Sequence, residues 1–386
     1  MAIFVSNRYL PRRILLLTGC FARAAAERHS ISRLWKQSSG LMARSVTQNA
    51  GDHGEHYITR DKKEYWAMFY SAAGGGVLIA LMALFKTYLG SIIDDKVWKG
   101  IAEGLNYGLG FMVIFMLHFT VATKQPAMTA ARFAEAVEKT PQGKTVNMKL
   151  AQLLVDVFRS QSIAVLGNVL IAMGLAALIA FGYQYKTGEP LMNADQIAYQ
   201  LHSIDPFAGT LWFAAIAGVW LFCSGIISGY FDNRSNYLNM RMRLTQHPLL
   251  KKLMSEKTRV KFANYMHENY GSLIGNLCFG MLLGITGVVG YLTHLPLDIR
   301  HVAFSSANVG YIAVSGHFTY SLLLQCIAFV LLIGLVNLIV SFSLTLWVAL
   351  RSLNAEIESW WPIWYEVCQI VKKRPLSLFF PVQLDK

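Results

Sequence analysis

Ionisable side chains inside long apolar runs are the residues of this chain best placed to do chemistry. Lys86 lies in the first such run and Glu103 in the second. Charges at membrane depth are costly, so residues of this kind are candidates for a functional site by default. Lys86 and Glu103 fall at similar depth, and a pair between them would neutralise both charges. We therefore expect Lys86 and Glu103 to form a candidate membrane ion pair. The pair would be either a structural tie or part of a relay. Alternatively, Lys86 extends its amine to the membrane interface.

A second set of polar residues lies near the opposite ends of the apolar runs. It comprises His118, Asn168, Asp232, Asn233 and Asn276. The expected topology places all five in the inner third of a membrane. They form a candidate intramembrane polar cluster, which would either lock the helices together by hydrogen bonds or line a site open to the cytoplasm.

The segment between the fourth and fifth apolar runs is strongly basic. Its candidate phosphate or lipid contacts are Arg234, Arg241, Arg243, Lys251, Lys252, Lys257, Arg259 and Lys261. Such a run, with aromatic residues interleaved, could hold a DNA backbone. It could equally bind anionic lipid headgroups. The orientation of membrane helices accounts for most of such a surplus, so membrane lipid is the expected partner and DNA the alternative.

Metal and cofactor chemistry has little support in this sequence. His53 and His56 lack the spacing of a His-Glu-x-x-His zinc motif, so a polar turn is the plainer interpretation. None of the five cysteines forms a CxxC pair, and three of them lie inside apolar runs, where a thiol usually packs. We therefore predict no cofactor and no metal site.

The composition indicates which elements hold these residues. Of the 386 residues, 54% are hydrophobic and only 15% are charged, whereas about a quarter are charged in soluble globular proteins. Six apolar runs each reach the ~20 residues that a helix needs to cross a bilayer. They cover residues 66–90, 101–121, 163–183, 207–230, 272–292 and 322–350. The expected fold class is all-α, a polytopic transmembrane helix bundle of about six spans.

The positions of the basic residues predict the orientation of this bundle. The net charge is +13, and 30 of the 35 Lys and Arg fall in segments on one side of the expected membrane. Because basic residues favour the cytoplasmic side, both termini are predicted to be cytoplasmic. The chain then divides into a cytoplasmic helical segment 1–65, a bundle 66–350 with basic cytoplasmic loops 122–162 and 231–271, and an interfacial helix with a tail in 351–386.

Two further features bear on packing. Residues 302–320 are apolar only in places and carry Ser, Asn and His, so we interpret them as an interfacial or re-entrant piece. A seventh span there would put the C-terminal basic cluster outside. Gly104 and Gly108 in the second run, and the many glycines of the fifth, indicate close approach of helix backbones.

Several strings in the chain resemble one family. They are Gly51-Asp-His-Gly-Glu-His-Tyr57, Ala73-Gly-Gly-Gly76, the stretch Leu117–Thr129, Ser228-Gly-Tyr-Phe-Asp-Asn233 and Leu295-Pro-Leu-Asp-Ile-Arg-His301. From about residue 20 onwards the chain resembles bacterial membrane proteins named site-specific recombinases, of the gonococcal crossover recombinase type. Members of that family are generally longer, with an additional helical N-terminal region. The resemblance therefore implies the C-terminal, membrane-embedded part, with the N-terminal region or a second copy of the chain as candidate partners.

The family name implies DNA recombination, but the sequence does not supply that chemistry. A tyrosine recombinase needs Arg and His groups that stabilise phosphoryl transfer to a Tyr nucleophile, and no His-x-x-Arg string occurs among the ten histidines. The Tyr-x-Arg-x-Ser string of serine recombinases is also absent. No catalytic residue is assigned. Two hypotheses remain for this expected bacterial inner-membrane protein: DNA recombination, implied by resemblance, or a transporter-like or scaffolding role without DNA chemistry.

Overall fold

The computed structural model describes residues 18, 58–59, 61–122, 125–138, 144–315, 318–353, 357 and 359–381. Within these residues every regular element is a helix and none is a strand. The predicted all-α class is therefore confirmed. His53 and His56 lie outside the described residues, as does most of the segment 1–65.

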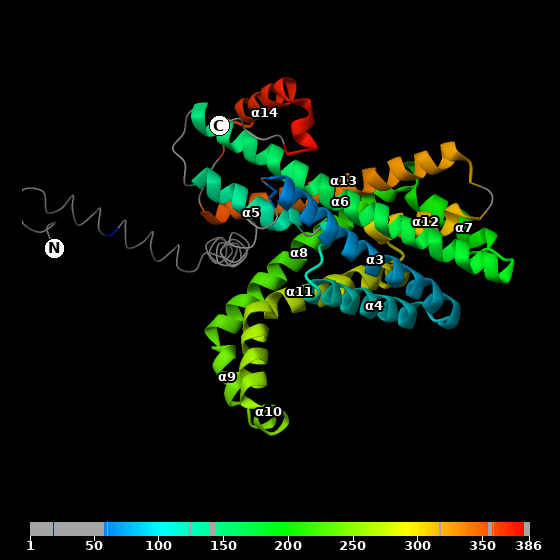
Figure 1. Cartoon of the computed structure of the whole chain (residues 1–386), viewed down its shortest axis with the longest axis horizontal. Coiled ribbons are helices and arrows are strands. Elements are labelled where there is room, and N and C mark those ends of the chain that lie inside the picture. Colours follow the sequence, from blue (N-terminus) through cyan, green and yellow to red (C-terminus); the bar gives the residue numbers. More distant parts are fainter. Residues whose placement is uncertain are drawn as a thin grey trace, which may run out of the picture.

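Five of the described helices are long and apolar enough to cross a membrane (Figure 1). They are α3 (Lys62–Ile92), α6 (Lys144–Thr187), α8 (Thr210–Tyr237), α11 (Glu256–Thr293) and α13 (Tyr320–Leu353). The second of the six expected spans corresponds to α4 (Lys96–Met116), which is not among them. Lys99, Glu103 and Asn106 interrupt the apolar stretch of α4, which has only 21 residues.

The two basic segments expected as loops are largely helical. α5 (Gln125–Glu138) and the first half of α6 occupy most of 122–162. α9 (Met240–Gln246), α10 (Pro248–Leu253) and the first half of α11 occupy most of 231–271. Hydropathy marks only the apolar part of a helix, so α6 and α11 begin well before the third and fifth expected spans.

The bundle has two distinct ends. At one end, here called the short-loop end, residues 93–95 turn the chain from α3 into α4. The carboxylate of Asp95 caps α4 by accepting hydrogen bonds from the amides of Val97 and Trp98. α7 (Ala194–Ile204) and the turn η5 (Pro206–Ala208) lie at the same end. The opposite end, here called the basic end, carries α5, α9, α10 and α14 (Trp361–Lys373).

α4 and α11 meet backbone to backbone through glycines. A Cβ at Gly280 would run into the backbone of Gly108, and one at Gly284 would run into that of Gly104. α3 and α6 meet in the same way, because a Cβ at Gly76 would crowd the backbone of Asn168. Small residues let helices approach this closely where lipid removes the hydrophobic drive between them.

The short helix α12 (Val302–Ala313) lies inside the bundle. It packs on α6, α13 and α3, and nearly all its residues are buried. Its 12 residues are about 18 Å long, too short to cross a bilayer. The segment expected as an interfacial or re-entrant piece therefore contains a short helix in the interior of the bundle.

A smaller apolar cluster holds the basic end together. α5, α6, α13 and α14 pack there around Phe133, Leu150, Leu346 and Ile363. Buried Arg159 on α6 donates hydrogen bonds to the carbonyls of Thr59 and Ser377. The turn η6 (Pro375–Leu378), which contains Ser377, is thereby fixed against α6.

We predict that Gly280→Ala lowers the free energy of unfolding by about 1–3 kcal/mol, because the new methyl group overpacks the contact with Gly108. The matched control is Gly174→Ala on α6, where a Cβ meets open space. That control should leave stability unchanged or raise it slightly, since alanine favours a helix over glycine. Thermal unfolding of both detergent-solubilised variants measures the difference, and equal midpoints would contradict the proposed α4–α11 contact.

Candidate functional site

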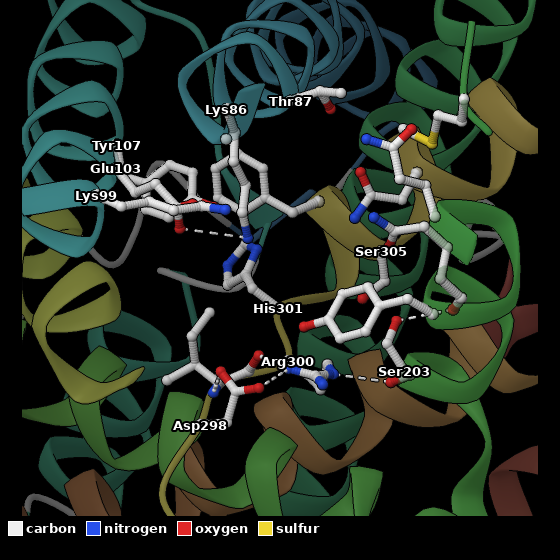
Figure 2. A pocket seen from close by; sticks show the side chains of 18 of the residues that line it. Lys86, Thr87, Lys99, Glu103, Tyr107, Ser203, Asp298, Arg300, His301 and Ser305 are labelled. Atoms are coloured by element: carbon white, nitrogen blue, oxygen red, sulfur yellow. Dashed lines mark hydrogen bonds and ion pairs between the residues drawn. The ribbon is translucent and has the colours of Figure 1, made fainter. Parts of the chain in front are cut away.

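A polar cavity of about 460 Å³ opens at the short-loop end of the bundle. α3, α4, α7, α12 and the non-helical residues 298–301 all contribute to its lining. Figure 2 shows Lys86, Glu103 and Tyr107 on one side of the cavity and Asp298 and Arg300 on the other. Charged side chains from two parts of the chain that are far apart in the sequence therefore line the same cavity.

The structure brings Lys86 and Glu103 together. The Nζ atom of Lys86 lies 3.6 Å from a carboxylate oxygen of Glu103, and their side chains are 38% and 14% exposed. The same ammonium group lies 5.8 Å from the ring centroid of Tyr107. Tyr107 is itself held by the ring of Phe304 on α12, at a centroid distance of 4.4 Å. The pair thus belongs to the wall of the cavity, next to α12.

The second charged pair comes from the segment that leads into α12. The guanidinium of Arg300 lies 2.6 Å from a carboxylate oxygen of Asp298, and its Nε donates to the carbonyl of Ser203. The guanidinium also lies 5.3 Å from the ring of Phe213 on α8. The tight contacts fix Arg300 between α7 and α8, at the edge of the cavity.

Residues 294–301 fold back along α11 after that helix ends. A Cβ at Gly290 would meet the backbone of Leu297, and the ring of Phe279 lies 5.8 Å from that of His301. The chain therefore returns from the end of α11 to about its middle before α12 begins. Such non-helical backbone is tolerated within a bundle only where it is buried in protein or lines a cavity.

Asn337, in the middle of α13, supplies the hydrogen bonds that this returning segment needs. Its side-chain oxygen accepts from the amide of Val302 at 3.1 Å. Its side-chain nitrogen donates to the carbonyls of Arg300 and Ala214, at 3.0 and 2.7 Å. One buried amide therefore joins α8, α13 and the start of α12.

His301 forms the inner wall of the site. The residue is buried and lines the cavity, and its ring contacts the rings of Phe111, Phe279 and Phe304. It therefore marks the boundary between the polar cavity and the apolar core.

The structure places Asn168 and Asp232, two members of the predicted polar cluster, in different helix contacts. Asn168 donates to the carbonyls of Ala72 and Thr120 and accepts from the amide of Ala122, so it joins α3, α6 and the segment after α4. Asp232 accepts from the amide of Gly271, which joins α8 to α11. Asn276 donates to a carbonyl of its own helix, at Ser272. Residues at a similar depth along the bundle therefore need not form hydrogen bonds within the same pair of helices.

The other two members of that set occupy more open positions. His118 is exposed and has a left-handed backbone with φ of 58°, at the turn after α4. Asn233 is half-buried on α8, close to the basic end.

The candidate phosphate or lipid contacts lie at the basic end, remote from the cavity. Seven of the eight are exposed, and Arg259 is half-buried. Among the described residues, no group of three or more His, Cys, Asp or Glu is arranged to hold a metal ion.

Sequence reasoning missed five residues of the site: Tyr107, Asp298, Arg300, His301 and Asn337. Asn337 is the only Asn in the apolar run 322–350, and that signal could have identified it. Asp298 and Arg300 appeared to be ordinary loop charges between two spans, because nothing in their spacing shows that the chain turns back.

A family model described as site-specific recombinase matches residues 3–381. The chain belongs to this family. The resemblance expected from the quoted strings is therefore confirmed, and the match begins earlier than about residue 20. No curated protein and no solved structure gives a significant match to this member of the family.

We predict that Asn337→Leu destabilises the protein by about 1–3 kcal/mol, because it leaves the buried amide of Val302 and the carbonyl of Arg300 without this partner. Ser341→Ala, one turn further along α13, is the control, since the buried hydroxyl of Ser341 has no hydrogen-bond partner among the described residues. Unfolding midpoints of the two purified variants test this. A loss no larger for Asn337→Leu than for Ser341→Ala would show that the amide does not hold the segment.

Proposed function

We propose that this protein is a multi-pass protein of the bacterial inner membrane, with the basic end in the cytoplasm. Five helices with the length and apolarity of membrane spans support this placement. The distribution of Lys and Arg supports the orientation, because the basic end holds most of them. The cavity at the short-loop end would then open to the outer side.

We further propose that the cavity binds a small polar solute, as a transport-type membrane protein does. The observation that carries this proposal is the convergence of Lys86–Glu103 and Asp298–Arg300 on one cavity beside non-helical backbone. Ionisable residues at membrane depth mark substrate pathways more often than lipid-facing surfaces. Broken or re-entrant helices beside a polar cavity are likewise a recurring way to build transporter sites.

The charges of the cavity favour a neutral polar or zwitterionic solute. Its lining includes three cationic side chains (Lys86, Lys99 and Arg300) and three acidic ones (Glu103, Asp195 and Asp298). A solute with a large net charge would be repelled by the side chains of like charge in the cavity wall. The volume of about 460 Å³ lies within the ordinary range for small-molecule sites.

This proposal replaces the DNA chemistry that the family description implies. The cavity lies at the end of the bundle opposite to the basic residues that could contact a phosphate backbone. The sequence offers no nucleophile with a matching set of Arg and His groups. DNA recombination would therefore need residues or partners beyond the site described above.

Accessibility of the cavity can be tested with single cysteines in a cysteine-free variant. Ser305 and Ser306 are both buried, but only Ser305 lines the cavity. We predict that a membrane-impermeant thiol reagent added to intact spheroplasts modifies Ser305→Cys and spares Ser306→Cys. Equal modification of both residues, or of neither, would contradict an outward-opening cavity.

Solute binding can be separated from a purely structural role of the ion pair. We predict that Lys86→Met and Glu103→Gln each destabilise the protein by about 1 kcal/mol, because the Lys86 side chain is more than a third exposed and the pair is partly solvated, and that the double variant recovers most of this loss. The wild type is then screened by thermal unfolding with the proteinogenic amino acids as zwitterionic probes. At least one should raise the midpoint of the wild type and not that of the double variant.

A shift of equal size in the double variant would show that the pair is only a structural tie. If no probe shifts the wild type and Ser305→Cys is not modified, the proposed function is wrong.

A further inference from the structure

The helices at the basic end form an arm that leaves the bundle. It comprises residues 234–261, which include the end of α8, the whole of α9 and α10, and the start of α11; we call it the basic arm. Figure 1 shows the arm directed away from the rest of the molecule and steeply across the direction of α6 and α13. α9 packs on α8, α10 and α11, and α10 packs on α9 and α11.

The base of the arm is fixed to the bundle by side-chain hydrogen bonds between α8 and α11. The carboxylate of Asp232 accepts from the amide of Gly271 at 2.9 Å. The hydroxyl of Ser235, which is fully buried, lies 3.1 Å from Nδ1 of His267. The arm is therefore a rigid continuation of two helices of spanning character.

The charge of the arm is almost entirely positive. It contains eight Lys and Arg and one acidic residue, Glu256. Lys251 donates to Gln246, and Arg259 donates to the carbonyl of Met254. Exposed cations concentrated in this way favour an anionic partner.

Large apolar side chains lie exposed between these cations. Tyr237 and Leu253 are 89% and 79% exposed, and Met242 and Leu249 are more than half exposed. DNA backbone offers phosphate to the cations but nothing to exposed leucines and methionine. A membrane surface offers both, because apolar side chains enter the acyl boundary while basic ones meet the headgroups.

We propose that the basic arm docks on the anionic inner leaflet of the membrane that the bundle spans. This inference rests on the membrane placement in the proposed function. An arm that crosses the direction of the spanning helices runs along the membrane plane, so its cations and its apolar side chains reach the same surface. Leu249, Leu253 and Met242 enter that surface, and the basic residues contact its phosphate groups.

The test uses the full-length, cysteine-free protein in nanodiscs, with one environment-sensitive fluorophore at Leu253→Cys. The discs contain phosphatidylcholine alone or mixed with phosphatidylglycerol, and the acyl chains are brominated so that they quench a nearby fluorophore. We expect quenching at Leu253→Cys in the anionic discs and much less in the neutral ones. Replacing Arg241, Arg243, Lys251 and Lys252 by Gln should remove the difference.

Two control positions keep the outcomes distinct. Leu335→Cys places the label at an exposed position on α13, where membrane insertion predicts quenching in both lipids. Glu189→Cys places it on an exposed residue at the short-loop end, where no quenching is expected. If the label at Leu335→Cys is not quenched, the membrane placement itself fails.

Quenching at Leu335→Cys without quenching at Leu253→Cys overturns the docking of the arm and leaves the proposed function intact. Equal quenching at Leu253→Cys in both lipids overturns the requirement for anionic lipid. If duplex DNA shifts the emission of the Leu253→Cys label and anionic lipid does not, the arm is a nucleic-acid surface instead. Energy transfer between labelled copies, in discs where the lipid does not quench, would assign the surface to a second copy of the chain.

Discussion

Every polar backbone group inside an apolar bundle must find a partner, and this constraint governs the architecture around the cavity. A helix satisfies its own backbone groups by hydrogen bonds between its turns. Residues 294–301 are not helical, however, and α12 begins in the middle of the bundle, so these residues need partners from elsewhere. Asn337 provides these partners: its side chain accepts a hydrogen bond from the amide of Val302 and donates to the carbonyls of Arg300 and Ala214. Without such a side chain the amide of Val302 and the carbonyls of Arg300 and Ala214 would lose this partner, so α13 helps to hold α12 in the interior.

The charges of the cavity follow from the same arrangement. A non-helical segment can place Asp298 and Arg300 side by side at the bundle's interior edge, where α7 and α8 offer a carbonyl and an aromatic face. α12 then presents Phe304 to Tyr107, which lies next to the Lys86–Glu103 pair. The two pairs are therefore coupled through a short, buried helix, so a solute that contacts one wall would act on the support of the other.

Much of the fold follows from the sequence because length and hydropathy of a helix are local properties. The long helices, and the pairing of Lys86 with Glu103, could be expected from depth along consecutive runs joined by a short turn. The contacts of Asn168 and Asp232 could not, because residues at one depth still belong to different helix pairs. The roles of Asp298, Arg300 and His301 were likewise hidden, since they depend on the chain turning back along α11. No pattern in the sequence records that return.

The glycine contact between α4 and α11 has a consequence for how the bundle assembles during synthesis. A Cβ at Gly104 would meet Met281 and one at Gly108 would meet Leu277, so the glycine face of α4 is covered by residues that the ribosome adds more than 150 residues later. Until α11 is synthesised, α4 lacks the helix with which it makes most of its contacts. A nascent chain halted before α11 would therefore carry an incompletely packed helix, which makes early truncation products natural targets for quality-control proteases.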